Sequence, residues 1–306
     1  MYIFIAGATS TGKSNIANFI SKELNGEILS CDASQVYKHM DIGTNKNRDL
    51  ETKQHLIDLI EPDQDFTVVD YKRCSNIVLN DLKKINITPI ITGGTGFYMD
   101  TYLYDQEYGA TTINQEEIKK SIEYDLKTKG AIYLYDELKK FDPITAKKTH
   151  PNNIRRVIRY LTIVKSGKKP STLSKTFKLK KENYLFFILT SSINLINEKI
   201  LKRIHIMIDL GLKEEVEKLL NLGYSFKLKS MQAIGYKEWE PFFYEKTEID
   251  TVIEQININT RQYAKKQRTW FNNQYKNISN VYYIDIEDNP HEQILDLIHK
   301  KGNTND

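Results

Sequence analysis

Short apolar runs alternate with amphipathic stretches through the first third of the chain. We expect buried strands over Tyr2–Ala6, Glu27–Cys31 and Thr88–Thr92, because each run is short and bounded by polar or turn-forming residues. Helical periodicity over Lys13–Leu24 and Asp70–Lys84 separates these strands. Strands that alternate with helices predict an α/β fold with a parallel, doubly wound sheet.

The pattern changes in the middle of the chain. Asn114–Lys165 is charged and helical in pattern, whereas Gly167–Lys181 is basic and lacks periodicity, as expected of a mobile loop. We therefore predict an α/β core formed by residues 1–105 and 183–306. A helical, basic insertion domain over residues 106–182 interrupts that core.

The C-terminal part is mostly helical in pattern. We expect a returning strand over Tyr184–Thr190, helices over Asn194–Leu210, Lys213–Leu222 and Ile249–Gln274, and a last strand over Val281–Ile286. In the long helix Ile249, Ile256, Tyr263 and Trp270 recur every seven residues. This repeat predicts one buried seam along the helix.

Basic residues are clustered, although 44 basic and 40 acidic residues leave a net charge of only +4. Lys147–Arg159, Lys165–Lys181 and Thr260–Lys276 each contain several basic residues and no acidic one. Three such stretches favour a polyanionic partner, although any one of them could be a solvated face. Two cysteines form no disulfide framework, and no apolar run is long enough to span a bilayer. Without a leader-like segment after Met1, we expect a cytoplasmic protein, and we expect a monomer.

One segment matches the P-loop pattern G-x-x-x-x-G-K-[ST], and it follows a predicted strand and opens a predicted helix. Its residues are Gly7, Ala8, Thr9, Ser10, Thr11, Gly12, Lys13 and Ser14. The glycines let backbone N–H groups point at phosphate oxygens, Lys13 adds a full charge, and the Ser14 hydroxyl can join a Mg²⁺ shell. We predict a diphosphate site with Mg²⁺ as cofactor. The pattern alone allows a nucleotide or an isoprenoid diphosphate equally.

Two further loops follow the second and third predicted strands, at Asp32–Tyr37 and Gly93–Tyr98. Parallel strands place their carboxyl ends at one edge of the sheet, so we expect both loops beside the P-loop. Asp32 could accept a proton, hold Mg²⁺ through water or cap a helix. Gln35 could read the edge of a base, and Thr95 offers a hydroxyl group.

The chain resembles the bacterial tRNA dimethylallyltransferases in the segments GATSTGKS, CDASQVYKHMDIGTNK, HLIDLIEP, ITGGTGFY, FDPITAKKTHPNNIRRVIRYL, QAIGYKE and TRQYAKKQRTWF. They occur in the family's order from about residue 5 to residue 271. The resemblance implies a P-loop NTPase-like fold. It also implies transfer of the dimethylallyl group from dimethylallyl diphosphate to N6 of the adenosine 3′ of the anticodon in tRNA, with Mg²⁺ and release of diphosphate.

The resemblance also implies roles for individual residues. Asp32 is similar to the general base, Thr95 to the threonine at the channel entrance, and Arg203 to an arginine that helps Lys13 and the rest of the P-loop hold diphosphate. The positions that resemble tRNA-contacting ones are Asp32, Ala33, Ser34, Gln35, Thr95, Lys119, Arg155, Arg156, Val157, Ile158, Arg159, Arg261, Lys265 and Arg268.

Three other functions share parts of this pattern. A P-loop kinase or NTPase would turn over ATP. An adenylate isopentenyltransferase would prenylate a free nucleotide, for which the basic helix and insertion are unnecessary. A non-catalytic RNA-binding protein would not need Lys13, Ser14, Asp32 and Thr95 together.

Overall fold

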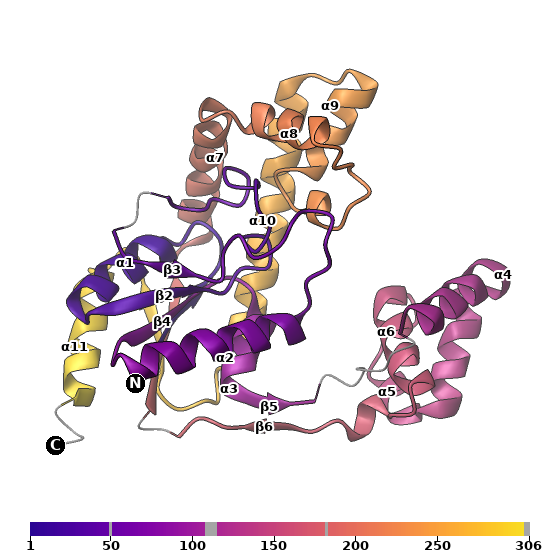
Figure 1. Cartoon of the computed structure of the whole chain (residues 1–306), viewed down its shortest axis with the longest axis horizontal. Helices are drawn as coiled ribbons and strands as arrows, with labels where there is room; N and C mark the ends of the chain where they lie inside the picture. Colours follow the sequence, from indigo (N-terminus) through magenta and orange to yellow (C-terminus); the bar gives the residue numbers. More distant parts are fainter. Residues whose placement is uncertain (49–50, 108–114, 181–182, 303–306) are drawn as a thin grey trace. The chain divides into compact units, whose positions relative to one another are not determined.

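The computed structural model describes residues 1–48, 51–107, 115–180 and 183–302 (Figure 1). The chain divides into a larger unit, Met1–Tyr102 with Leu179–Asp306, and a smaller unit, Leu103–Lys178. The sequence placed the corresponding boundaries at 105/106 and 182/183. No helix in the described ranges combines the length and apolar character needed to cross a membrane.

The larger unit is built on a parallel sheet. Within the described residues its six strands are ordered β3-β2-β4-β1-β7-β8. They are β1 (Tyr2–Gly7), β2 (Gly26–Ser30), β3 (Gln54–His55), β4 (Thr88–Gly93), β7 (Tyr184–Thr190) and β8 (Val281–Asp285). All neighbours pair in parallel. The predicted α/β fold and its strands are therefore confirmed, while the short edge strand β3 was missed because it lacks an apolar run.

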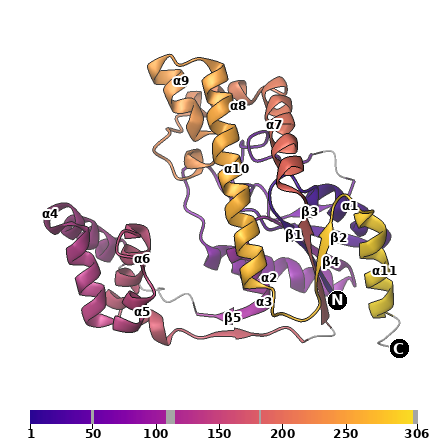
Figure 2. The same cartoon turned by 180° about the vertical axis from the view of Figure 1, so that it is seen from behind.

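Helices cover both faces of this sheet. On one face α1 (Lys13–Glu23) and α11 (Pro290–Gly302) bury a cluster that includes Ile5, Ile90 and Phe187 (Figures 1 and 2). On the other face lie α2 (Val68–Lys84), α3 (Gly96–Leu103) and part of α10 (Ile249–Gln274), over an aromatic group that includes Phe4. Because successive side chains of a strand point to opposite faces of the sheet, residues of a single strand pack into both hydrophobic cores.

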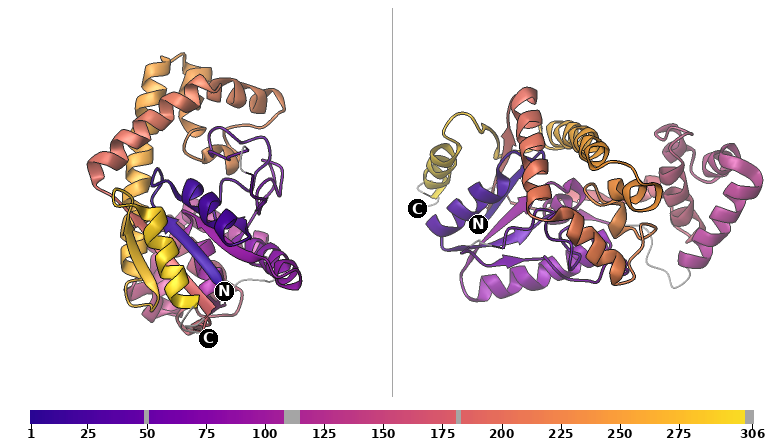
Figure 3. Two further views of the ribbon diagram at one scale, coloured as in Figure 1. Left: turned by 90° about the vertical axis from the view of Figure 1, so that its left-hand side faces the viewer. Right: turned by 90° about the horizontal axis from the view of Figure 1, so that it is seen from above.

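A helical region follows β7. It contains α7 (Ile193–Asp209), α8 (Leu212–Asn221), α9 (Glu240–Glu245), the 3₁₀ turns Ser230–Gln232 and Lys237–Trp239, and α10. Helices α7 and α10 lie side by side (Figure 3). The long helix predicted over Ile249–Gln274 has the same bounds as α10.

The predicted seven-residue seam of α10 is confirmed only in part. Its buried residues are Val252, Ile256, Ala264, Gln267 and Phe271. Tyr263 instead is 37% exposed. Of the four predicted positions only Ile256 is buried. Ile249 and Trp270 are half-buried, and Tyr263 is exposed to the cavity described below. The polar residue Gln267 completes the buried face, which an apolar repeat cannot predict.

The smaller unit has a helical core of its own. Its elements are β5 (Tyr104–Gln106), α4 (Gln115–Phe141), α5 (Pro143–Lys147), α6 (Ile154–Lys165), the 3₁₀ turn Pro170–Thr172 and β6 (Lys175–Phe177). β5 and β6 pair antiparallel, so the expectation of a loop throughout Gly167–Lys181 is wrong. The basic side chains of this stretch concealed a strand that is only three residues long.

Asp142 joins two elements of the smaller unit. Its carboxylate caps α5 by accepting the Thr145 N–H at 3.0 Å and also accepts the Ser171 N–H at 2.9 Å. Burial opposes ionisation, but these hydrogen bonds outweigh it and hold the pKa of Asp142 below its ordinary value. The Phe-Asp-Pro segment thus has a structural role.

Candidate active site

The P-loop connects β1 to α1 as its pattern predicts. Gly12 caps α1 in the left-handed region at φ 79°, where a side chain would be strained. The Thr11 hydroxyl donates to the Ala8 carbonyl at 2.8 Å, and Nζ of Lys13 donates to the same carbonyl at 2.6 Å. These bonds curl the loop around the N-terminus of α1, where unpaired N–H groups favour an anion.

Two cations approach this loop from different helices. Arg203 of α7 donates from Nη1 to the Thr9 hydroxyl at 2.9 Å, while Lys13 begins α1. Burial lowers the pKa of Lys13 to about 8 against the opposing effect of Asp32, and Arg203 lowers it further. Burial also lowers the pKa of Arg203, again opposed by Asp32. Desolvated cations without a paired carboxylate attract an anionic ligand strongly.

Two buried hydroxyl groups near the P-loop lack hydrogen-bond partners within the described residues. They are Oγ of Ser10 and Oγ1 of Thr92. Ser10 belongs to the P-loop, and both residues line the cavity described below. Buried polar atoms are nearly always paired, so a ligand with several acceptor oxygens would complete this site.

Asp32 and Thr95 lie on adjacent loops, as predicted. Oγ1 of Thr95 accepts the Ala33 N–H at 3.0 Å, and the Thr95 N–H donates to the Cys31 carbonyl at 3.0 Å. The Ser34 N–H donates to Oδ1 of Asp32 at 2.9 Å. The aspartate is therefore fixed by local hydrogen bonds instead of capping a helix.

Gln35 is occupied by contacts within the protein. Its Oε1 accepts the Ser30 hydroxyl at 2.7 Å, and its Nε2 donates to the carbonyls of Thr44 and Asn45 at 3.2 and 3.3 Å. These bonds use both ends of the amide. Reading a base edge through Gln35 would require them to break.

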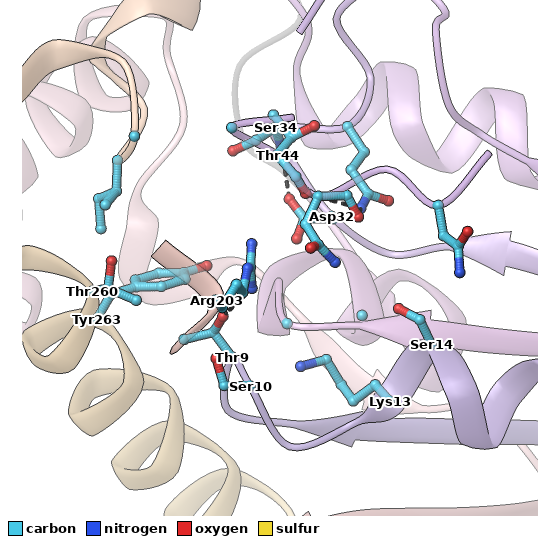
Figure 4. A pocket seen from close by; sticks show the side chains of 18 of the residues that line it. Thr9, Ser10, Lys13, Ser14, Asp32, Ser34, Thr44, Arg203, Thr260 and Tyr263 are labelled. Carbon is cyan, nitrogen blue, oxygen red and sulfur yellow. Dashed lines mark hydrogen bonds between the residues drawn. The ribbon is translucent and has the colours of Figure 1, made fainter. Parts of the chain in front are cut away.

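A cavity of about 550 Å³ joins these groups. Its polar end is lined by Thr9, Ser10, Lys13, Ser14, Asp32 and Arg203. Its apolar wall is formed by Ile200, Ile204 and Met207 of α7 with Ile234 and Ile256. In Figure 4 Arg203, Asp32 and Lys13 surround one space, while Thr260 and Tyr263 of α10 lie on the side away from Ser14. This cavity can hold an anionic group and an apolar chain at the same time.

Sequence reasoning missed three residues around this cavity. Gln267 contacts the P-loop, Tyr263 lines the cavity, and Glu215 of α8 holds the loop that contains Gly43. Glu215 also accepts the Tyr236 hydroxyl at 2.6 Å, which connects the QAIGYKE segment to that loop. Tyr263 is recognised as a site residue only because it lines the cavity. No periodic pattern in the sequence distinguishes Gln267 or Glu215 from ordinary polar helix residues.

The residues that resemble tRNA-contacting positions fall into different environments. Lys119, Arg155, Arg156, Arg159, Arg261 and Lys265 are exposed, and Arg268 is half-buried in a small cavity behind the P-loop. Ile158 packs against the core of the smaller unit, and Val157 is 1% exposed inside it. The Val157 side chain faces the helical core as α6 turns, so a contact between this residue and tRNA would have to use its backbone.

Known proteins match the chain along most of its length. The family model described as IPP transferase matches residues 35–274. A tRNA dimethylallyltransferase of Acetivibrio thermocellus is 36% identical over 292 residues, which cover 94% of this chain and 92% of that protein. One of Alkaliphilus oremlandii is 36% identical over 300 residues, covering 96% and 95%.

Solved structures give the same result. A tRNA delta(2)-isopentenylpyrophosphate transferase from Staphylococcus epidermidis is 31% identical with a TM-score of 0.69, and the match covers 100% of both chains. A eukaryotic dimethylallyltransferase captured acting on tRNA is 27% identical with a TM-score of 0.84, covering 99% of this chain and 79% of the other. The chain belongs to the IPP transferase family, alongside the tRNA dimethylallyltransferases.

Proposed function

We propose that the protein transfers the dimethylallyl group of dimethylallyl diphosphate to N6 of the adenosine 3′ of the anticodon in tRNA, releasing diphosphate. The observation that carries this proposal is the single cavity with a phosphate-binding P-loop at one end and an apolar wall from α7 at the other. A nucleotide kinase needs the first feature, but an isoprenoid donor needs both. Family membership supports the same reaction class.

The leaving group belongs at the P-loop. Breaking the bond between C1 and the diphosphate oxygen places negative charge on diphosphate, which the backbone N–H groups, Lys13 and Arg203 would stabilise. Both cations are half-buried, which limits competition from water, so their attraction for that charge is stronger than at the surface.

The donor set at the P-loop fits Mg²⁺. The Ser14 hydroxyl and the Asp32 carboxylate both line the cavity, and both are hard oxygen donors. No group of three His, Cys, Asp or Glu side chains that could hold a metal occurs among the described residues. Mg²⁺ is commonly held by one or two protein oxygens together with substrate phosphates and water. When bound, Mg²⁺ would neutralise charge on the departing diphosphate.

Asp32 would act as the general base. Its Oδ1 accepts the Ser34 N–H, and no hydrogen bond reaches Oδ2 within the described part of the chain. As the N6–C1 bond forms, one N6 proton would pass to Asp32, which offsets the weak nucleophilicity of an amine attached to adenine. The Thr95 hydroxyl, which holds the Ala33 N–H, would keep this carboxylate at the cavity edge.

The tRNA would bind through basic surfaces on both units. Arg261 and Lys265 are exposed on α10, and Arg155, Arg156 and Arg159 are exposed on α6. Moving the target adenine out of its stack costs a few kcal/mol. Contacts between these cations and RNA phosphates would offset that cost.

Transfer of label from radioactive dimethylallyl diphosphate to unmodified tRNA tests this function. We would follow ATP hydrolysis in parallel and offer free AMP as a competing acceptor, with Lys13→Ala beside the unaltered protein. Label in tRNA that disappears in the variant, without ATP turnover, is expected. Label only in AMP would indicate a nucleotide prenyltransferase, and ATP hydrolysis without label would indicate a different P-loop enzyme.

A further inference from the structure

Gln267 is a buried polar residue that connects two loops of the cavity. It lies on α10 and is 6% exposed. Its Oε1 accepts the N–H of Thr9 in the P-loop at 2.8 Å, and its Nε2 donates to the carbonyl of Gly94 at 3.0 Å. One side chain thus bonds to the loop after β1 and the loop after β4.

Gly94 leaves the space that this contact requires. A Cβ atom added at Gly94 would lie 2.1 Å from Nε2 of Gln267, far closer than two unbonded atoms can approach. The glycine therefore allows the amide to reach the backbone of its own loop. The Gly-Gly-Thr segment combines this close approach with the hydroxyl group of Thr95.

The hydrogen bonds continue from Gly94 toward Asp32. The next residue, Thr95, bonds to both neighbours of the aspartate, through the Cys31 carbonyl and the Ala33 N–H, each at 3.0 Å. In the other direction, Thr9 belongs to the P-loop and precedes Ser10. The Thr9 hydroxyl accepts a hydrogen bond from Arg203 at 2.9 Å. A continuous path therefore links the phosphate cradle to the carboxylate through Gln267.

We infer that Gln267 is a positioning residue that fixes the spacing between the P-loop and Asp32. This inference rests on the proposed prenyl transfer, in which the amine nitrogen, C1 and the leaving oxygen must align. A displacement of about 1 Å in such an arrangement costs on the order of 100-fold in rate. Although Gln267 lines the cavity, both ends of its amide are occupied by backbone groups of the two loops, through which we expect it to act.

The variant Gln267→Met tests this role, because methionine has a similar length and forms neither hydrogen bond. We expect kcat to fall about 100-fold while the KM for tRNA stays within about threefold. We also expect a larger share of the donor to be hydrolysed: water forms the bond to C1, diphosphate leaves, and dimethylallyl alcohol accumulates. A residue needed only for folding would lower the melting temperature without changing the ratio of alcohol to prenylated tRNA.

Two further variants sharpen the test. Gln255→Met changes an exposed glutamine on the same helix and should leave kcat within about twofold. Gly94→Ala should push Gln267 aside and produce the same increase in alcohol, and the double variant with Gln267→Met should show less than the sum of the two effects. Additive effects would mean that the two residues act independently and would overturn the inference.

The result for the unaltered protein separates this inference from the proposed function. If that protein transfers no label to tRNA, prenyl transfer is wrong, and binding of inorganic diphosphate then tests Gln267 directly. We expect Gln267→Met to bind inorganic diphosphate about tenfold more weakly than Gln255→Met, because the P-loop loses the contact that fixes Thr9 in place. If the protein transfers label and Gln267→Met matches Gln255→Met in kcat and product ratio, Gln267 does not position the loops.

Discussion

Two sets of charged side chains in the larger unit differ in how they are paired. The first, here called the ion-pair network, consists of Asp41, Lys46, Arg48 and Asp58. Its four N–O contacts measure 2.6 to 2.9 Å. The second set, Lys13, Asp32 and Arg203, forms no ion pair within 4.0 Å among the described residues, although all three line one cavity. The charges of the ion-pair network are satisfied by one another, so removing one would leave its partners unpaired, whereas the charges of the second set are available to a ligand.

Both sets include residues from segments that resemble family motifs, such as Lys13 and Asp32 in one set and Lys46 in the other. Lys46 lies in the DIGTNK segment, and its side chain is 1% exposed and also donates to the Tyr37 carbonyl. In the same segment Gly43 gives its N–H to Glu215 at 3.1 Å. A Cβ atom at Gly43 would lie 2.4 Å from the ring of Tyr236. This motif therefore shapes the cavity wall, which the match to a family alone does not reveal.

Removing a cation of the unpaired set should have the largest effect. We expect Lys13→Ala to lower prenyl transfer by about 1,000-fold, because the departing diphosphate loses a desolvated positive charge. Since Lys13 forms no ion pair in the described structure, the melting temperature should change little. Steady-state kinetics and thermal unfolding would measure the two effects.

Lys22→Ala is the matched control for this change. Lys22 lies on the same helix and pairs with Glu51 at 2.8 Å, but both side chains are largely exposed. Such surface pairs contribute about 1 kcal/mol or less. Equal losses of activity in the two variants would show that charge on α1, and not the placement of Lys13, supports the reaction.

Replacing the proposed base should have a somewhat smaller effect. We expect Asp32→Asn to lower kcat by about 100- to 1,000-fold, because proton removal from N6 loses its acceptor. Affinity for tRNA should persist, since the amide oxygen can still accept the Ser34 N–H. Filter binding of labelled tRNA would measure the affinity, with exposed Asp63→Asn as control. Normal turnover by Asp32→Asn would remove the general-base role.

The contrast between the two sets also explains what the sequence could predict. The P-loop glycines, Asp32 and Thr95 each follow a buried strand, and parallel strands bring such loops to one edge. Helix α10 was predictable because apolar residues recur at helical spacing along it and glycine and proline are absent. These are local properties of the chain. The fold class and the grouping of these three loops follow from them.

The partners of polar side chains were not predictable in this way. Gln267 belongs to a polar segment whose sequence predicts exposure. It is buried because the oxygen and the nitrogen of its side-chain amide form hydrogen bonds with residues 258 and 173 positions away. Lys46 similarly appears to be a surface lysine until Asp41 and Asp58 surround it. Burial of a polar group depends on long-range hydrogen bonds, which periodicity does not encode.

Breaking the ion-pair network should reduce stability and not chemistry. We expect Lys46→Met to lower the free energy of unfolding by about 2–3 kcal/mol, less than for a fully dry pair because Asp41 and Asp58 remain partly exposed beside Arg48. Urea unfolding would measure this loss. Lys53→Met, at a lysine 66% exposed, is the control. If Lys46→Met lost as much turnover as Lys13→Ala while fully folded, the two sets would not differ in role.

Acid should weaken the same network. Partial burial would raise the pKa of Asp58, but hydrogen bonds from Arg48 and Lys46 outweigh it and hold that pKa below its ordinary value. A lowered pKa in the folded state gives stability that is present above the unfolded value near 4 and is lost as pH falls through the folded value. The unfolding free energy of Lys46→Met should therefore depend less on pH in acid than that of the unaltered protein.

Alkali should act on the unpaired set, with the smallest of these effects. Burial lowers the pKa of Lys13 to about 8, so the ammonium group is charged at neutral pH and loses its proton above that value. We expect kcat/KM for dimethylallyl diphosphate to fall about tenfold per pH unit above about pH 8, because this ratio follows ionisation in the free protein. In Lys13→Arg the guanidinium stays charged. We expect this variant to be less active than the unaltered protein, but its kcat/KM should not decline above about pH 8. If kcat/KM of the unaltered protein stayed constant up to about pH 9.5, the charge on Lys13 would not hold diphosphate. The opposite pH responses of the two sets would then no longer distinguish them.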